Sequence, residues 1–125
     1  MAGKIVADQL QHSTAGTINT QFVVDGSAKA WIAVTVAAAI DSSLNISSVT
    51  DTASGEFDPQ LTSSMSTALY CSNTGVDLTG HVTRSAATEA RTTSSVKLIS
   101  YQTHSASASE NSIDSIHSSS FGDLA

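Results

Sequence analysis

The sequence predicts an all-β fold: a single β-sandwich of about seven or more short antiparallel strands over residues 21–125, preceded by an N-terminal arm over residues 1–20. From Gln21 onward, short runs alternate apolar and polar residues, which is the period of half-buried strands. The runs recur every ten to twenty residues or so, with turn-forming residues between them. This spacing fits a sandwich rather than a helical bundle or a sheet built of βαβ units.

The composition favours an oligomer. Ser and Thr make up about 30% of the 125 residues, aromatic residues only 5%, and much of the 40% hydrophobic fraction is Ala. Apolar burial contributes roughly 25 cal/mol per Å², and ordering the chain costs about 1.5 kcal/mol per residue, so a monomer of this composition is marginally stable. Partner subunits can complete a core that one subunit leaves open, and we therefore expect an obligate homo-oligomer.

The N-terminal arm is predicted to be a tether before the domain. The segment "KIVADQLQ" has the spacing of about two helical turns, with Ile5, Val6 and Leu10 on one side. Gly16 and the turn formers around it end this pattern before the first strand. The three apolar side chains are the candidate contact residues of the arm.

The segment "QFVVDGSAKAWIAVTV" predicts a β-hairpin. Asp25-Gly26 is a dipeptide that supplies the positive φ angles of a type I′ turn. In the second strand Ile32 and Val34 face one side and Trp31 the other, so one face fills the core while the indole covers a neighbouring strand, a subunit or a ligand. An ordinary core position for the tryptophan is the alternative, because a buried Trp covers roughly 150–250 Å².

The segments "IDSSLNISSVT" and "GEFDPQLTSSM" predict two more strands, joined by a turn over Asp51–Gly55. Pro59 is the only proline and has no N–H to donate. The strand that contains it is therefore expected at a sheet edge, or bulged at that residue.

The segment "STALYCSNTG" predicts a strand with Leu69 and Cys71 on one side and Tyr70 on the other. Cys71 is the only cysteine and cannot form an intrachain disulfide. We expect it to be a small buried residue rather than a reactive thiol. The remaining strands are expected in "GHVTRSA", "TTSSVKLISYQT" and "SIDSIHSSSFGDLA".

The run "HSASASENS" from His104 to Ser112 has no large apolar residue and is expected to be an exposed loop. Such a loop is either a recognition surface or a plain connector. The predicted contact residues are His104, Ser105, Ser107, Ser109, Glu110 and Asn111.

Charge and hydropathy narrow the range of partners. The net charge is −6, and the five Lys and Arg residues are scattered, which argues against nucleic acid. The start "MAGKIVADQL" lacks the features of a signal peptide, and no long apolar run follows, so we expect synthesis in a cytoplasm and no membrane insertion.

No catalytic or metal motif stands out, so no enzymatic activity and no cofactor are expected. No G-x-S-x-G elbow, Gly-rich phosphate loop or paired carboxylates occur. The histidines stand alone in sequence, and we expect surface or packing roles for them, with clustering around an oligomer axis as the alternative. They are His12, His81, His104 and His117.

One stretch resembles a known family. The core "GSAKAW" (residues 26–31), followed by "IDSSLNISSVTDTASGEF", is similar to a module at the C-terminal end of tail fibre and related virion proteins of bacteriophages, many of them marine. The similarity spans Val24 to about Phe57, and the closing "FGDLA" (residues 121–125) matches the end of several such proteins. The chain departs from the family pattern in "AVTVAAAI" after the Trp and in the turn "DTASG".

The resemblance implies a trimeric, mostly β structural protein on the virion surface, made in the host cytoplasm. In such a trimer Trp31, Ile32 and Val34 would pack in the core or between subunits. The expected function is that of a tail fibre or tail appendage whose arm binds other virion proteins and whose distal loops contact a carbohydrate or protein of the host surface. A capsid decoration or head-fibre protein is the alternative.

Overall fold

The computed structural model describes residues 6–77, 84–102 and 114–125, and in this part of the chain it confirms the all-β sandwich. All strand pairs are antiparallel. The elements in chain order are β1 (Gln9–His12), β2 (Gly16–Asn19), α1 (Thr20–Gly26), β3 (Ala30–Thr35), β4 (Ile40–Leu44), β5 (Ile46–Ala53), β6 (Glu56–Leu61), β7 (Cys71–Asp77), β8 (Arg84–Arg91), β9 (Val96–Gln102) and β10 (Ser115–Phe121).

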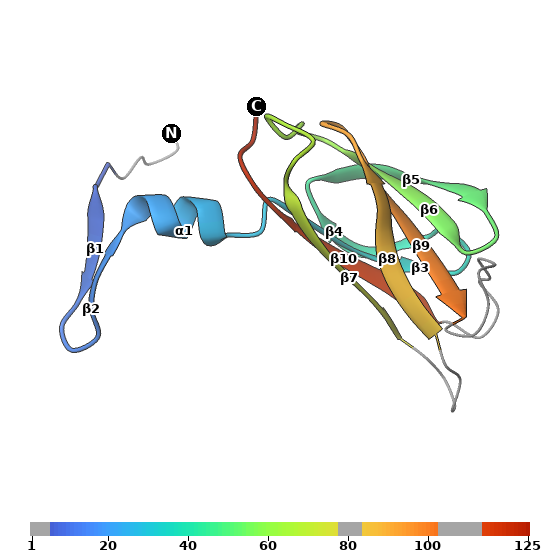
Figure 1. The fold of residues 1–125 in the computed structure, drawn as a ribbon, viewed down its shortest axis with the longest axis horizontal. Coiled ribbons are helices and arrows are strands. Elements are labelled where there is room, and N and C mark those ends of the chain that lie inside the picture. Colours follow the sequence, from blue (N-terminus) through green and yellow to red (C-terminus); the bar gives the residue numbers. More distant parts are fainter. Residues whose placement is uncertain (1–5, 78–83, 103–113) are drawn as a thin grey trace.

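Two four-stranded sheets form the sandwich, with strand orders β4-β3-β10-β7 and β5-β6-β9-β8 (Figure 1). The last strand, β10, lies between β3 and β7, so pairing of the two ends of the domain completes the first sheet. The hairpin β5–β6 turns at Ser54 and Gly55, inside the turn predicted from the sequence.

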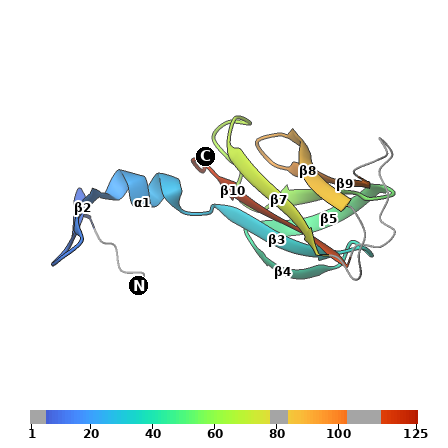
Figure 2. The ribbon, with the colours of Figure 1, turned by 60° about the horizontal axis from the view of Figure 1, so that its bottom comes forward.

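The N-terminal extension (residues 6–28) consists of the β1–β2 hairpin and α1, and it projects from one end of the sandwich (Figures 1 and 2). The helix predicted over "KIVADQLQ" is not observed in its last three residues, 9–11. These residues belong to β1, which pairs with β2. The sandwich begins at Ala30 rather than at residue 21, so α1 also belongs to the extension.

The hairpin predicted at Asp25-Gly26 is also wrong, since both residues lie in α1. The Gln21 amide donates to the Asp25 carboxylate one helical turn away, at 2.7 Å. Past the helix end, the Ser27 hydroxyl and the Lys29 ammonium both donate to the carbonyl oxygen of Val24. These side chains satisfy backbone groups at the C-terminus of the helix, which stabilises a helix end where the sequence pattern suggested a turn.

The core lies between the two sheets and takes alternate residues from the strands, as the period of two requires. Ile32 and Val34 point into it, at 2% and 0% exposure. The other buried apolar residues are Ala30, Phe57, Leu61, Met65, Tyr70, Val96, Leu98 and Ile116.

A cluster of hydroxyl groups completes the interior where β7 faces β8. The Ser72 hydroxyl lies 3.1 Å from Ser118 Oγ, accepts from Thr88 Oγ1 at 3.1 Å, and accepts from Ser120 Oγ at 3.4 Å. Thr88 also lies 2.9 Å from Thr74 Oγ1. Because these hydroxyls bond to one another, they close this side of the sandwich without leaving polar groups unpaired.

Two further expectations, for Pro59 and for Cys71, are wrong. Pro59 lies in β6, an inner strand, and is fully buried. The β6–β9 ladder tolerates it because direct pairing stops after Phe57 and resumes only at Gln60. Cys71 is exposed rather than buried, because Tyr70 before it takes the inward position at 4% exposure.

The C-terminal residues "FGDLA" fasten the end of the chain to the segment before β7. Asp123 accepts a backbone hydrogen bond from Ser66, and Ala125 donates one to Ser64. A Cβ atom added at Gly122 would lie 2.8 Å from the Cβ of Tyr70, closer than two such atoms approach. Glycine is therefore required at this position for close packing.

We expect Gly122→Ala to lower the free energy of unfolding by about 1–3 kcal/mol, because the added methyl group displaces Tyr70 from its buried position. Chemical denaturation followed by circular dichroism measures this loss. Gly75→Ala is the matched control, since a Cβ at Gly75 meets no atom within 4 Å. An equal effect of both substitutions would contradict the packing role of Gly122.

Candidate functional site

The outer face of the sheet β4-β3-β10-β7 carries an unusual set of side chains. Residues that pair directly across antiparallel strands share one face, so the registers define transverse rows. Each strand contributes one residue to each row. The first row is Leu44, Trp31, Ser119 and Asn73, and the second is Ser42, Ala33, His117 and Gly75.

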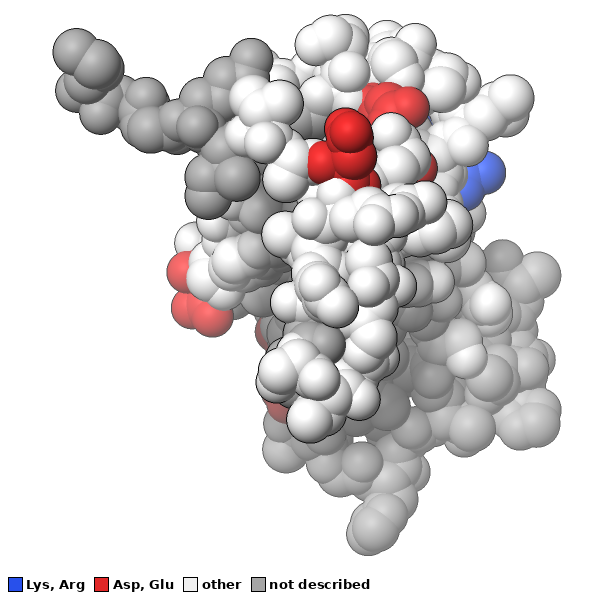
Figure 3. Space-filling model, turned by 90° about the vertical axis from the view of Figure 1, so that its left-hand side faces the viewer, with Lys and Arg blue, Asp and Glu red and all other residues white. Residues whose placement is uncertain are grey.

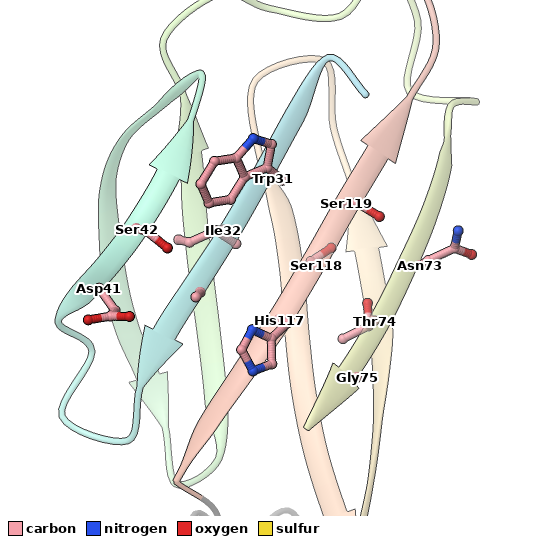
Figure 4. Close-up of a pocket in the computed structure, with 11 residues that line it drawn as sticks. Trp31, Ile32, Asp41, Ser42, Asn73, Thr74, Gly75, His117, Ser118 and Ser119 are labelled. Carbon is pink, nitrogen blue, oxygen red and sulfur yellow. The ribbon is translucent and has the colours of Figure 1, made fainter. Parts of the chain in front are cut away.

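A shallow hollow of about 540 Å³ lies on this face (Figure 4). Trp31 and His117 rise from the floor of the hollow (Figure 4), and the registers place the small residues Ala33 and Ser119 next to both of them. Because these two side chains are short, the sheet surface drops between the two rings. Gly75 lies on the other side of His117 and extends the floor toward β7. We call this feature the outer hollow, with Asp41, Ser42 and Asn73 at its margins.

Trp31 does not lie in the core of its own subunit. Its side chain is on the outer face, and the residue is 38% exposed. The core alternative for Trp31 is therefore wrong, because Ile32 and Val34 occupy the inward positions of β3. A contact of Trp31 with another subunit stays a prediction.

A hydrogen-bonded group fixes the imidazole at the end of the hollow. Nε2 of His117 lies 2.7 Å from Oδ2 of Asp77 and 2.9 Å from Oγ of Ser115. Ser115 also donates to the same carboxylate oxygen at 3.1 Å. The hydrogen bond from His117, followed by that from Ser115, lowers the pKa of Asp77 below its ordinary value of 3.8.

These three residues do not have the geometry of a catalytic triad. In a triad the hydroxyl and the carboxylate bind opposite ring nitrogens, so that a proton can pass across the imidazole. Here both partners lie at the same nitrogen, Nε2. The arrangement orients the ring of His117 and provides no such path.

Charge on the outer hollow is acidic. Asp41 lies in its lining and Asp77 lies behind His117, whereas no Lys or Arg lines it among the described residues. On the second sheet, Lys97 Nζ lies 2.8 Å from Glu56 Oε2 and 2.7 Å from Glu89 Oε2. The Lys97 ammonium donates hydrogen bonds to the Glu56 carboxylate and the Glu89 carboxylate, which raises the pKa of Lys97, and the cluster keeps one net negative charge.

The other predicted residues are distributed as follows. Val6 and Leu10 are exposed on the extension, at 82% and 46%, and Ile5 lies outside the described residues. The predicted host-contact loop, as well as His81 and His104, also falls outside them. His12 lies in β1 of the extension, whereas His117 lies in β10 of the sandwich.

Sequence reasoning did not find Asp41, Asn73, Gly75, His117 and Ser119 as one group. Alternation alone places Asn73, Gly75 and Asp77 on one face of their strand. Their meeting with Trp31 depends on the insertion of β10 between β3 and β7, which no local pattern indicates.

Within the described ranges, no three His, Cys, Asp or Glu side chains lie close enough to hold a metal ion. None of the described helices has the length and hydropathy needed to cross a membrane. No protein-family model matches the chain, and neither the curated proteins nor the solved structures contain a match.

We expect the carboxyl group of Asp77 to titrate below pH 3.8 in the folded protein, because His117 and Ser115 donate to its charged form. Because the pKa of Asp77 is lower in the folded than in the unfolded chain, this contact stabilises the fold at pH values above the unfolded pKa. The stabilisation is lost as the pH falls through the folded pKa. NMR titration of the Asp77 carboxyl should show the midpoint moving up in His117→Ala and moving less in Ser115→Ala. An unchanged midpoint in His117→Ala would contradict the assignment.

Proposed function

We propose that this protein is a non-enzymatic structural protein of a bacteriophage virion, a tail fibre or tail appendage that takes part in host attachment. The N-terminal extension binds other virion proteins, and the sandwich is held away from the particle surface. The "GSAKAW" and "FGDLA" segments support the virion assignment through their resemblance to tail fibre modules. The extension supports the docking role.

The single observation behind the docking role is the exposure of large apolar side chains on the extension. No residue of α1 is buried, and Phe22 is 64% exposed. A seven-residue helix and a two-stranded hairpin are each marginal in water without packing against other structure. A partner surface must therefore cover the apolar residues, which are Val6, Leu10, Ile18, Phe22, Val23 and Val24.

The surface seen from this end is consistent with a protein partner. Uncharged side chains dominate the described part of that view, with scattered carboxylates and little basic charge (Figure 3). Phosphate recognition requires clustered Lys and Arg. The extension is therefore suited to apolar contacts with a protein rather than to phosphate binding.

We further propose that the assembled form is a homotrimer. In the described part of the chain the core of one subunit is small, with ten buried apolar residues, and the apolar side chains of the extension stay exposed when the subunit is alone. Light scattering should give about three times the 12.8 kDa mass of one chain.

The decisive experiment is incorporation of the variant Phe22→Ser into particles. Because Phe22 contacts no core residue, the variant should keep the parent melting temperature but fall at least tenfold in copy number per particle. Quantitative mass spectrometry of purified virions measures the copy number.

Leu69→Ser is the matched control, since Leu69 is an 88% exposed apolar residue of the sandwich. It should leave incorporation unchanged. Normal incorporation of Phe22→Ser would overturn the docking role. A parent copy number in the hundreds, rather than a few to tens, would favour the capsid decoration alternative over a tail appendage.

A further inference from the structure

We propose that the outer hollow binds a neutral saccharide, with Trp31 as the stacking platform and the polar residues at the margins as hydrogen-bonding groups. This inference deepens the proposed function, on which it rests for its biological role. The binding itself is a property of the sandwich surface.

Trp31 supplies an apolar platform that its own subunit does not cover. The indole is 38% exposed on the outer face, and its row neighbour Leu44 is 47% exposed. The face of an aromatic ring carries negative π density and attracts polarised C–H groups. One face of a pyranose ring presents several such C–H groups, so a sugar can cover the indole while its hydroxyls remain at the edge.

The polar groups around the platform suit those hydroxyls. The Asn73 amide and the Ser42 and Ser119 hydroxyls can each donate and accept a hydrogen bond. The Asp41 carboxylate accepts only, and it lies across the hollow from Asn73 (Figure 4). Sugar hydroxyls both donate and accept hydrogen bonds, so they match this mixed set of groups. A peptide backbone matches it less well, because its N–H groups only donate, its C=O groups only accept, and the two alternate in fixed order.

The charge of the site selects among saccharides. Asp41 lines the hollow and Asp77 lies behind His117, with no lining Lys or Arg among the described residues. A sugar acid would place its carboxylate near these acidic groups with no Lys or Arg of the described lining to pair with it, and His117 already pairs with Asp77, so the like charges would repel one another. The geometry therefore points to neutral sugars rather than sialic or uronic acids.

The shape sets the expected strength of binding. A volume of about 540 Å³ falls in the range of about 300–1,000 Å³ typical of small-molecule sites. The hollow is shallow, however, so it covers only one side of a ligand, and we expect a dissociation constant on the order of 1 mM. Several copies on one particle would raise the overall avidity by roughly 10²–10⁴ without any new contact.

Gly75 offers a direct way to test the hollow. It lies in the second row, beside His117, and a Cβ at this position meets no atom within 4 Å. Gly75→Val therefore adds bulk to the part of the hollow beyond His117, which a sugar of two or three rings stacked on Trp31 would reach, and its first added carbon meets no existing atom. Ser48→Val is the matched control, because Ser48 is an exposed strand residue on the other sheet.

The experiment is titration of the full-length protein with lactose, maltotriose and chitotriose, with sialyllactose as the charged counterpart of lactose. Trp31 is the only tryptophan, so its fluorescence reports on the site alone. We expect a saturable change with at least one neutral sugar at concentrations up to the order of 10 mM, about ten times the expected dissociation constant. For that sugar, Gly75→Val should weaken binding at least tenfold, whereas Ser48→Val should not. If lactose binds, sialyllactose should bind at least fivefold more weakly.

Three results would overturn the proposal. The first is no saturable change with any neutral sugar, and the second is equal binding by Gly75→Val. The third is a fluorescence change that depends on protein concentration and not on sugar, because it would show that a second copy of the chain covers Trp31. The Phe22→Ser incorporation test is independent of these results, so failure of saccharide binding and failure of virion docking can be told apart.

Discussion

The sandwich depends on a small apolar contact between its two sheets. Val34 and Ile116 come from the central strands of one sheet, Phe57 and Leu98 from the central strands of the other, and all four are fully buried. The edge strands β5, β7 and β8 add only partly buried apolar residues, namely Ile46, Val49, Val76 and Ala86. Hydroxyl groups then complete the interior near β7 and β8, because the chain has too few large apolar side chains to fill eight strands. Each hydrogen bond in this cluster contributes only about 0.5–1.5 kcal/mol net, so the buried apolar residues, with these four at their centre, contribute most to the stability of the fold.

The outer hollow follows from that same core. Once Ile32 and Val34 of β3 point inward, the period of two directs Trp31 and Ala33 outward. Register with β10 then places Ser119 beside Trp31 and His117 beside Ala33. A slip of one residue would bury the indole and expose the core, which the apolar contact forbids. The site is therefore held by the packing on the opposite side of its own sheet, and rigid strands rather than loops position its side chains.

Sequence reasoning succeeded where local pattern and packing agree. The strand around Trp31, the hairpin of β5 and β6 and the sandwich class all follow from alternation and turn residues. It failed at Asp25-Gly26, where polar side chains stabilise a helix end in place of a turn, and at Pro59, whose position depends on strand order. It missed the grouping of Trp31, Ser119 and Asn73 for the same reason. Residues far apart in sequence become neighbours only when the C-terminal strand closes the sheet, and no local period specifies that pairing.

The proposed docking of the extension and the proposed saccharide binding of the outer hollow share one physical consequence, which is dependence on assembly. Apolar residues of the extension, such as Phe22, are exposed in the single chain and would be covered by the docking partner. The hollow is too shallow for one copy to hold a ligand tightly, so useful affinity requires several copies on one support. A small core also benefits from subunit contacts, because any partner that binds only the folded state stabilises it by mass action. Attachment of the extension to a multivalent particle would meet all three requirements at once. For this reason we place docking at one end of the molecule and recognition on the outer sheet.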